Sequence, residues 1–134
     1  MSTLIRGGTV VNHDHSQRAD VLVVGERIAA VGAKVDAPAG AQVIDAGGAL
    51  VMPGGIDPHT HMELMFMGKV SADDFEWGTK AGLSGGTTMI VDFCIPAPGE
   101  SMLAAYQAWR HKAEKACADY SFHMAVTQWS PMIH

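Results

Sequence analysis

The sequence contains little of what marks a secreted, membrane-bound or nucleic-acid-binding protein. Cys94 and Cys117 are its only cysteines and form no C-x-x-C pair, so we expect reduced thiols in a cytoplasmic protein. The N-terminal residues contain no apolar run long enough for a secretory signal or a transmembrane helix, and we expect no membrane association. Nine basic residues stand against fourteen acidic ones, and no basic stripe is present, which argues against a nucleic-acid-binding surface.

The length of the chain limits the folds that it can complete. Its 134 residues suffice for one ordinary domain. The composition is 48% hydrophobic and 17% charged, which is typical of a globular protein with a core rather than of a disordered chain. A complete barrel of eight β/α units needs roughly 250 residues, so this chain cannot form one by itself.

Residues 1–52 have the pattern of short strands separated by turns. Gly25 and Glu26 are expected to form a two-residue hairpin turn between two strands. Strands repeated at this spacing predict part of a β-sandwich. The expected strands are residues 4–5, 9–11, 20–24, 27–32, 42–46 and 49–52.

Residues 53–134 change to alternating strands and helices. Residues 87–93 are almost continuously β-branched or apolar, which is typical of a strand buried on both faces of a parallel sheet. The segment therefore predicts the order β-α-β-α-β and the α/β class. The expected elements are strands at residues 54–61, 87–93 and 121–127, a loop at residues 62–71, a helix that is capped by residues 71–74 and runs to about residue 83, and a second helix at residues 101–117.

Two histidines, His59 and His61, form an H-x-H pattern at the end of the first strand of this second segment. In an extended chain both side chains point to one face and Thr60 to the other, so the two rings can reach a common cation. Imidazole suits zinc, copper, iron and nickel, and the spacing alone does not choose among them. Because chemistry in parallel α/β proteins gathers at the carboxyl ends of strands, we interpret the pair as a metal site.

A second H-x-H pattern, formed by His13 and His15, has a different context. Its neighbours in the sequence NHDHSQ are polar, and we interpret it as a solvent-exposed loop without a metal role.

The sequence around the first strand resembles a known enzyme family. The run MPGGIDPHTHMEL, followed by GGTTMIVDF, resembles the cyclic amidohydrolases, and most closely the dihydropyrimidinases, also called D-hydantoinases. The similarity extends from LIRGGTVVN near the start to DYSFHMAVT near the end. It implies a metal-dependent hydrolase that opens the cyclic amide bond of dihydropyrimidines or 5-substituted hydantoins. It also implies the N-terminal part of a β-sandwich in residues 1–52, followed in residues 53–134 by the first β/α units of a TIM-type (β/α)8 barrel that this chain leaves incomplete.

The resemblance also assigns roles to individual residues. It implies that His59 and His61 bind zinc, one of two divalent ions in a complete homotetrameric enzyme, whose other ligands and catalytic groups lie beyond residue 134. Leu64 and Phe66 match hydrophobic positions of a loop that contacts the substrate, although Met65 stands where that loop often has proline. We therefore expect no ring-opening activity from the 134-residue chain alone.

Three further polar residues are interpreted from the pattern itself. Asp57 is a candidate to orient one of the imidazoles from behind the metal ligands. Asp92 lies at the carboxyl end of its strand, where a hydrogen-bonded structural role is favoured over a catalytic one. His123 lies in mid-strand and is interpreted as a packed core histidine.

Other functions remain open at this point. An allantoinase or a dihydroorotase would share the H-x-H strand and differ in the substrate loop. A non-catalytic assembly protein could keep the fold without the metals, but the intact His59 and His61 pair argues against it. A third alternative is a free-standing short protein that binds a partner through an open sheet edge.

Overall fold

The computed structural model describes residues 1–129. The chain divides into two compact units, Met1–Pro53 and a second unit that begins at Gly54. The sheet of the first unit has mixed strand directions, and the three-stranded sheet of the second unit is parallel. With its two helices, the described part of the chain is of the α/β class. Neither described helix is long and apolar enough to cross a membrane.

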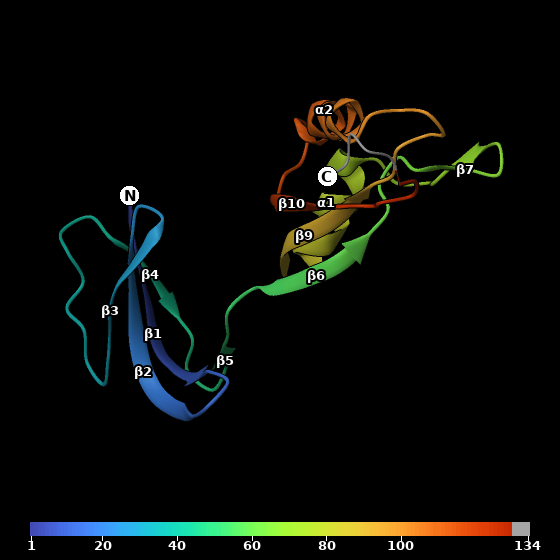
Figure 1. The fold of residues 1–134 in the computed structure, drawn as a ribbon. Helices are drawn as coiled ribbons and strands as arrows, with labels where there is room; N and C mark the ends of the chain where they lie inside the picture. The colour runs from blue at the N-terminus through green and yellow to red at the C-terminus, as the bar shows by residue number, and fades with distance from the viewer. Residues whose placement is uncertain (130–134) are drawn as a thin grey trace. The chain divides into compact units, whose positions relative to one another are not determined.

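The first unit is a five-stranded sheet, drawn in blue to green in Figure 1. The strand order is β3-β2-β1-β4, and β5 also pairs with β1. The first three strands are antiparallel neighbours, whereas β4 and β5 run parallel to β1. Gly25 has a φ of +60° in the predicted hairpin turn, a conformation that glycine adopts at little cost. The strands are β1 (Ser2–Val11), β2 (Ser16–Val24), β3 (Arg27–Gly32), β4 (Gln42–Asp45) and β5 (Leu50–Val51).

A buried carboxylate holds an irregular part of this first sheet. The pairing of β1 with β2 shifts register between Ile5 and Gly8, which is a β-bulge. Asp20 is only 6% exposed and accepts hydrogen bonds from the backbone N–H of Gly7 at 2.8 Å and of Val35 at 3.0 Å. These bonds, first that from Val35 and then that from Gly7, lower the pKa of Asp20 below its usual value.

The first sheet also carries an apolar groove of about 230 Å³. Its lining comes mainly from aliphatic side chains of β1, β2 and β3 together with the residues that follow β5. These include Val10, Val21, Val23, Ile28, Val31 and Val51.

The second unit is a parallel sheet of three strands in the order β10-β9-β6, and the chain connects the strands through two helices (Figure 1). The expected order β-α-β-α-β is therefore observed. Asp74 caps the first helix by accepting a hydrogen bond from the N–H of Trp77, and Ser101 caps the second through Ala104. The elements are β6 (Gly55–Thr60), α1 (Phe75–Ser84), β9 (Thr87–Cys94), α2 (Met102–Ala113) and β10 (Asp119–Met124).

Several elements differ from the sequence prediction. The strands expected at residues 4–5 and 9–11 form one continuous strand, β1, and the strands expected at residues 49–52 and 54–61 are shorter. The second helix ends at Ala113 rather than at residue 117, and β10 spans Asp119–Met124 rather than residues 121–127. The segment predicted as a loop at residues 62–71 contains a small antiparallel hairpin, β7 (Met65–Phe66) and β8 (Lys69–Val70). Its two turn residues, Met67 and Gly68, have φ values of +49° and +77°, as a tight two-residue turn requires.

Alternate residues of β9 face opposite sides of the sheet, and the helices cover one side only. Ile90, Asp92 and Cys94 are buried on the helix side, where Phe75 and Trp109 complete the core. Burial, with a further contribution from the charge of Asp92, raises the pKa of the Cys94 thiol to about 11. Val91 and Phe93 alternate with these residues and are only half-buried, and no described helix covers their side of the sheet.

Candidate metal centre

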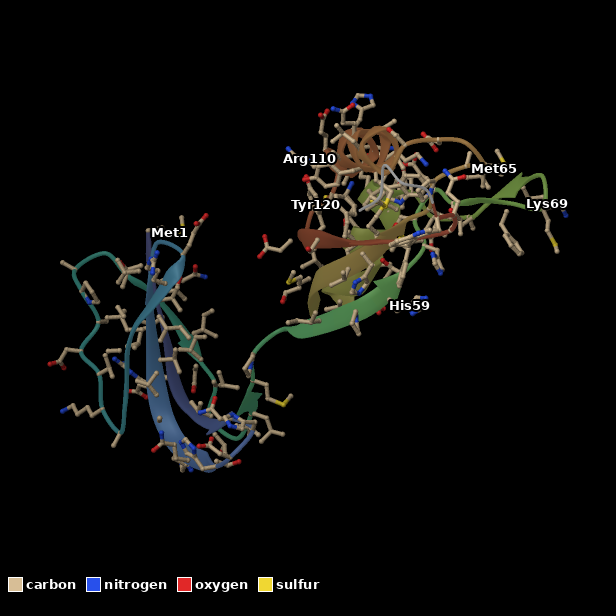
Figure 2. The ribbon with its side chains drawn as sticks, in the orientation of Figure 1. Met1, His59, Met65, Lys69, Arg110 and Tyr120 are labelled. Carbon is tan, nitrogen blue, oxygen red and sulfur yellow. The ribbon has the colours of Figure 1, made fainter. Side chains whose placement is uncertain are left out.

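His59 and His61, the H-x-H pattern of the second unit, converge at the carboxyl end of β6. The Nε2 atoms of His59 and His61 are 3.2 Å apart, and both side chains are exposed. Figure 2 labels His59 on β6. The rings meet edge to face, with centroids separated by 5.1 Å. Thr60, between them, points the other way and donates its hydroxyl to the Asp92 carboxylate. The structure thus brings the two predicted ligands together on one side of the strand.

The convergence comes from a strand that is not regular. Asp57 pairs with Ile90 and Thr60 pairs with Asp92, so three steps along β6 match only two along β9. This is the signature of a β-bulge, which changes the direction of the side chains that follow it. Simple alternation of side chains therefore does not hold between Asp57 and His59.

The carboxylate of Asp57 contacts the backbone and not the ring of His59. Its Oδ1 accepts a hydrogen bond from the backbone N–H of His59 at 3.1 Å. A short side chain that bonds two residues ahead in this way fixes a local turn. The role of Asp57 in orienting an imidazole stays a prediction.

An aromatic ring supports the two histidines from the neighbouring strand. The ring centroid of Phe93 lies 4.5 Å from that of His59 and 5.5 Å from that of His61. The centroid of the same ring lies 4.8 Å from that of His123, whose Nε2 is 3.1 Å from the carbonyl oxygen of Pro58. A carbonyl oxygen only accepts, so His123 must carry its proton on Nε2 to make this bond.

The prediction that His123 is a packed core histidine was wrong. The residue is exposed, because Tyr120, Phe122 and Met124 occupy the helix-facing side of β10 and His123 lies on the opposite side. The apolar residues at every second position of β10 indicated this arrangement, but the sequence interpretation did not use that alternation.

Asp92 is the most enclosed polar residue next to the histidines. It is fully buried and accepts hydrogen bonds from three groups: the Thr60 hydroxyl at 2.8 Å, the Met62 backbone N–H at 2.8 Å and the Trp109 indole N–H at 2.9 Å. A buried carboxylate is costly unless such donors surround it. The hydrogen-bonded role expected for Asp92 is confirmed, although nothing in the sequence named its partners.

The two residues predicted to contact a substrate lie in different surroundings. Leu64 is half-buried against the core of the second unit, and its backbone is bonded to Ser71. Phe66 is 66% exposed on β7, in the hairpin on which Figure 2 labels Met65 and Lys69. Their roles in substrate binding stay predictions.

The geometry of the histidine pair fits a bound cation. Two nitrogens that bind one zinc ion at 2.0–2.1 Å with a tetrahedral angle are about 3.3 Å apart. The observed 3.2 Å between the Nε2 atoms agrees with this value. The same distance also suits an N–H···N hydrogen bond between two neutral rings. Within residues 1–129, no group of three or more histidine, cysteine, aspartate or glutamate side chains could hold a metal ion.

Comparisons with known proteins identify the family of the chain. The sequence matches the amidohydrolase family over residues 42–125. It is 54% identical to dihydropyrimidinase from Rattus norvegicus over 97% of this chain, and 46% identical to D-hydantoinase from Geobacillus stearothermophilus over 96% of it. The chain covers 26% and 27% of these two proteins, so it spans about a quarter of the length of the curated relatives that it matches.

Solved structures give the same result. The crystal structure of dihydropyrimidinase from Brevibacillus agri superimposes with a TM-score of 0.95 at 47% identity, covering 99% of this chain and 29% of the other. A D-hydantoinase from Bacillus sp. AR9 superimposes with a TM-score of 0.93 at 50% identity, covering 98% of this chain and 28% of that one. The chain therefore belongs to the amidohydrolase family.

Proposed function

We propose that this chain forms part of a metal-dependent hydrolase that opens the cyclic amide bond of dihydropyrimidines or 5-substituted hydantoins. The observation that carries the proposal is the 3.2 Å approach of His59 and His61 at the carboxyl end of a parallel strand. Members of the amidohydrolase family are generally metal-dependent, and relatives similar to this chain include proteins named dihydropyrimidinase and D-hydantoinase.

His59 and His61 would hold one divalent cation, for which zinc is our proposal, through their Nε2 atoms. When bound, such a cation polarises an amide carbonyl and lowers the pKa of a water molecule towards 7. Both rings must then be neutral at Nε2, with their protons on Nδ1, so that the lone pairs face the cation. A zinc site that performs catalysis usually has three protein ligands, so further ligands would come from residues outside this chain.

The fold of the complete protein belongs to the same proposal. The three parallel strands β6, β9 and β10 would be the first strands of a (β/α)8 barrel, with the uncovered face of β9 turned towards the barrel interior. The sheet of the first unit would form half of a β-sandwich, and its apolar groove of about 230 Å³ gives a second sheet a surface to cover. We further propose a homotetramer, as the family resemblance implies.

The substrate would meet this chain at the hairpin that follows the histidines. Phe66, which is 66% exposed on β7, offers an apolar surface to a ring substituent. Leu64 would hold the base of the hairpin in place, since its half-buried side chain packs against the core. Allantoin and dihydroorotate are the alternative substrates that a test must include.

The test uses the full-length protein that contains this chain, with its metal content and ring-opening activity measured together. We expect about two zinc ions per protomer and hydrolysis of dihydrouracil in preference to allantoin and dihydroorotate. His59→Ala should abolish turnover and reduce the metal content. His13→Ala is the matched control, because His13 belongs to the exposed H-x-H pattern of the first unit.

Two results would contradict the proposal. Turnover that persists in His59→Ala would remove the metal role of the pair. A protein that binds zinc and hydrolyses only allantoin or dihydroorotate would assign the chain to a different cyclic amidohydrolase.

A further inference from the structure

His61 lies between two residues that are bonded to the same carboxylate oxygen. The hydroxyl of Thr60 donates to Asp92 Oδ2 at 2.8 Å, and the backbone N–H of Met62 donates to that same oxygen at 2.8 Å. The chain is therefore attached to one atom of the neighbouring strand immediately before His61 and immediately after it. None of the other histidines for which the structure gives contacts is flanked in this way.

The carboxylate that receives these bonds is itself held firmly. Asp92 is fully buried, and its other oxygen, Oδ1, accepts the indole N–H of Trp109 at 2.9 Å. Trp109 lies on α2 and is only 7% exposed. The carboxylate thus links β6, β9 and α2, and its position is set by the core rather than by solvent.

The strand that carries the histidines needs such an anchor. The ladder with β9 is interrupted between Asp57 and Thr60, in the stretch that contains His59 and directly precedes His61. A bulged segment has fewer backbone bonds to fix its twist. Because successive side chains of a strand face opposite sides, holding the Thr60 side chain on the helix side directs its two neighbours to the other side.

We infer that Asp92, acting through Thr60 and the Met62 amide, is the positioning residue that sets the separation of the His59 and His61 nitrogens for metal binding. The inference rests on the proposed metal role of this pair. Neither Asp92 nor Thr60 touches the metal or the substrate in this arrangement. A side chain that orients ligands from behind them typically changes metal affinity 10- to 100-fold when it is removed.

The decisive comparison uses two threonines whose hydroxyls are hydrogen-bonded, Thr60, which is half-buried, and Thr79, which is buried. Thr60→Val removes the hydroxyl that binds Asp92 and keeps the shape of the side chain. Thr79→Val is the matched control, because Thr79 is fully buried and its hydroxyl bonds to the carbonyl of Phe75 and the amide of Cys117, away from the histidines. Thr60→Ser keeps the hydroxyl and should preserve zinc binding.

Three quantities are measured in the full-length protein: zinc affinity by competition with a chelator, the thermal midpoint of the metal-free form, and the visible spectrum after cobalt substitution. We expect Thr60→Val to lower zinc affinity about tenfold or more and to change the cobalt spectrum. Thr60→Ser should keep both properties. Thr79→Val should lower the thermal midpoint and leave affinity and spectrum unchanged.

The inference is overturned if Thr60→Val lowers only the thermal midpoint, as Thr79→Val does, because Asp92 would then be structural alone. Asp92→Asn gives a second test, since it keeps the size of the side chain and replaces one acceptor with a donor; unchanged zinc affinity in that variant also overturns the inference. Zinc affinity that His59→Ala fails to reduce contradicts the proposed function instead, and this result is independent of the two threonine variants.

Discussion

The chain contains the H-x-H pattern twice, and the two segments differ in their surroundings. In the first unit, the Nδ1 of His15 is 2.7 Å from Asp14 Oδ1 and that of His13 is 3.9 Å from it, and the side chain of His13 is 94% exposed. In the second unit, His59 and His61 turn their Nε2 atoms towards each other at 3.2 Å. Phe93 lies against both rings, and Asp92 holds the residues on either side of His61.

The comparison shows what spacing contributes and what it leaves undetermined. Spacing allows two rings to share a face. In the first segment, however, the charged group next to both rings is the carboxylate of Asp14, which lies between them in the sequence. In the second segment a buried carboxylate and an aromatic ring reduce the freedom of the strand. A pair of ligands is thus defined by the residues that hold the backbone as much as by the ligands themselves.

The largest effect that separates the two segments should follow loss of the buried carboxylate. Asp92→Ala leaves the Thr60 hydroxyl, the Met62 amide and the Trp109 indole without their acceptor. Each such group costs on the order of 1–3 kcal/mol, so we expect the free energy of unfolding to fall by about 3 kcal/mol. Asp14→Ala, in the exposed segment, should change it by less than about 0.5 kcal/mol.

Urea unfolding measures this difference. The three tryptophans all follow residue 53, so their fluorescence reports the second unit, and circular dichroism reports the whole chain. If the two variants lost the same free energy of unfolding, Asp92 would stabilise its segment no more than Asp14 stabilises the exposed one.

A smaller effect should follow loss of the bond between β10 and the bulge. His123→Phe keeps a ring against Phe93 and removes the hydrogen bond to the carbonyl of Pro58. Because this bond is exposed, we expect a loss of about 0.5–1 kcal/mol in tryptophan-monitored urea unfolding. His111→Phe, on the exposed side of α2, is the control and should change the unfolding midpoint less; a larger shift in the control would remove the role of His123.

The smallest effect concerns the acid dependence of the first unit, where Asp20 supports a bulge that contains no histidine. The backbone bonds from Val35 and Gly7 lower its pKa below 3.8 in the folded state. A lowered folded-state pKa means that the stabilisation is fully present above about pH 4–5 and is lost as the pH falls through the folded-state value. Asp20→Asn should therefore weaken the acid dependence of the first unit.

Nuclear magnetic resonance gives the measurement for Asp20. The amide proton shifts of Gly7 and Val35 should change together, at a pH below 3.8. A transition of these two amides above pH 4 would contradict the assignment of the bonds.

Much of the fold could be predicted from local patterns. The hairpin turn at Gly25, the helix cap at Asp74 and the β-α-β-α-β order each depend on residues close together in the chain. The convergence of His59 and His61 followed from a pattern of three residues and its position at the end of a strand. The small hairpin was missed, although the Met67-Gly68 turn carried a local signal for it.

The features that could not be predicted depend on residues far apart. The bulge in β6 is visible only in the pairing with β9, and one extra residue there changes which side chains share a face. Asp92 bonds to groups that lie 32, 30 and 17 residues away in the sequence. Propensity and periodicity say nothing about such partners, so the surroundings of the histidines had to come from the structure.

The two cysteines differ in exposure, so their reaction with a thiol reagent can report unfolding of the second unit. Cys117 is exposed, so a thiol reagent can reach it in the folded protein. Cys94 is fully buried and its pKa is about 11, so it stays a protonated, shielded thiol at neutral pH. The labelling rate of Cys94 therefore measures how often the second unit unfolds locally. Zinc bound at the proposed histidine site should slow this rate, and the labelling of Cys117 serves as a reference within the same molecule.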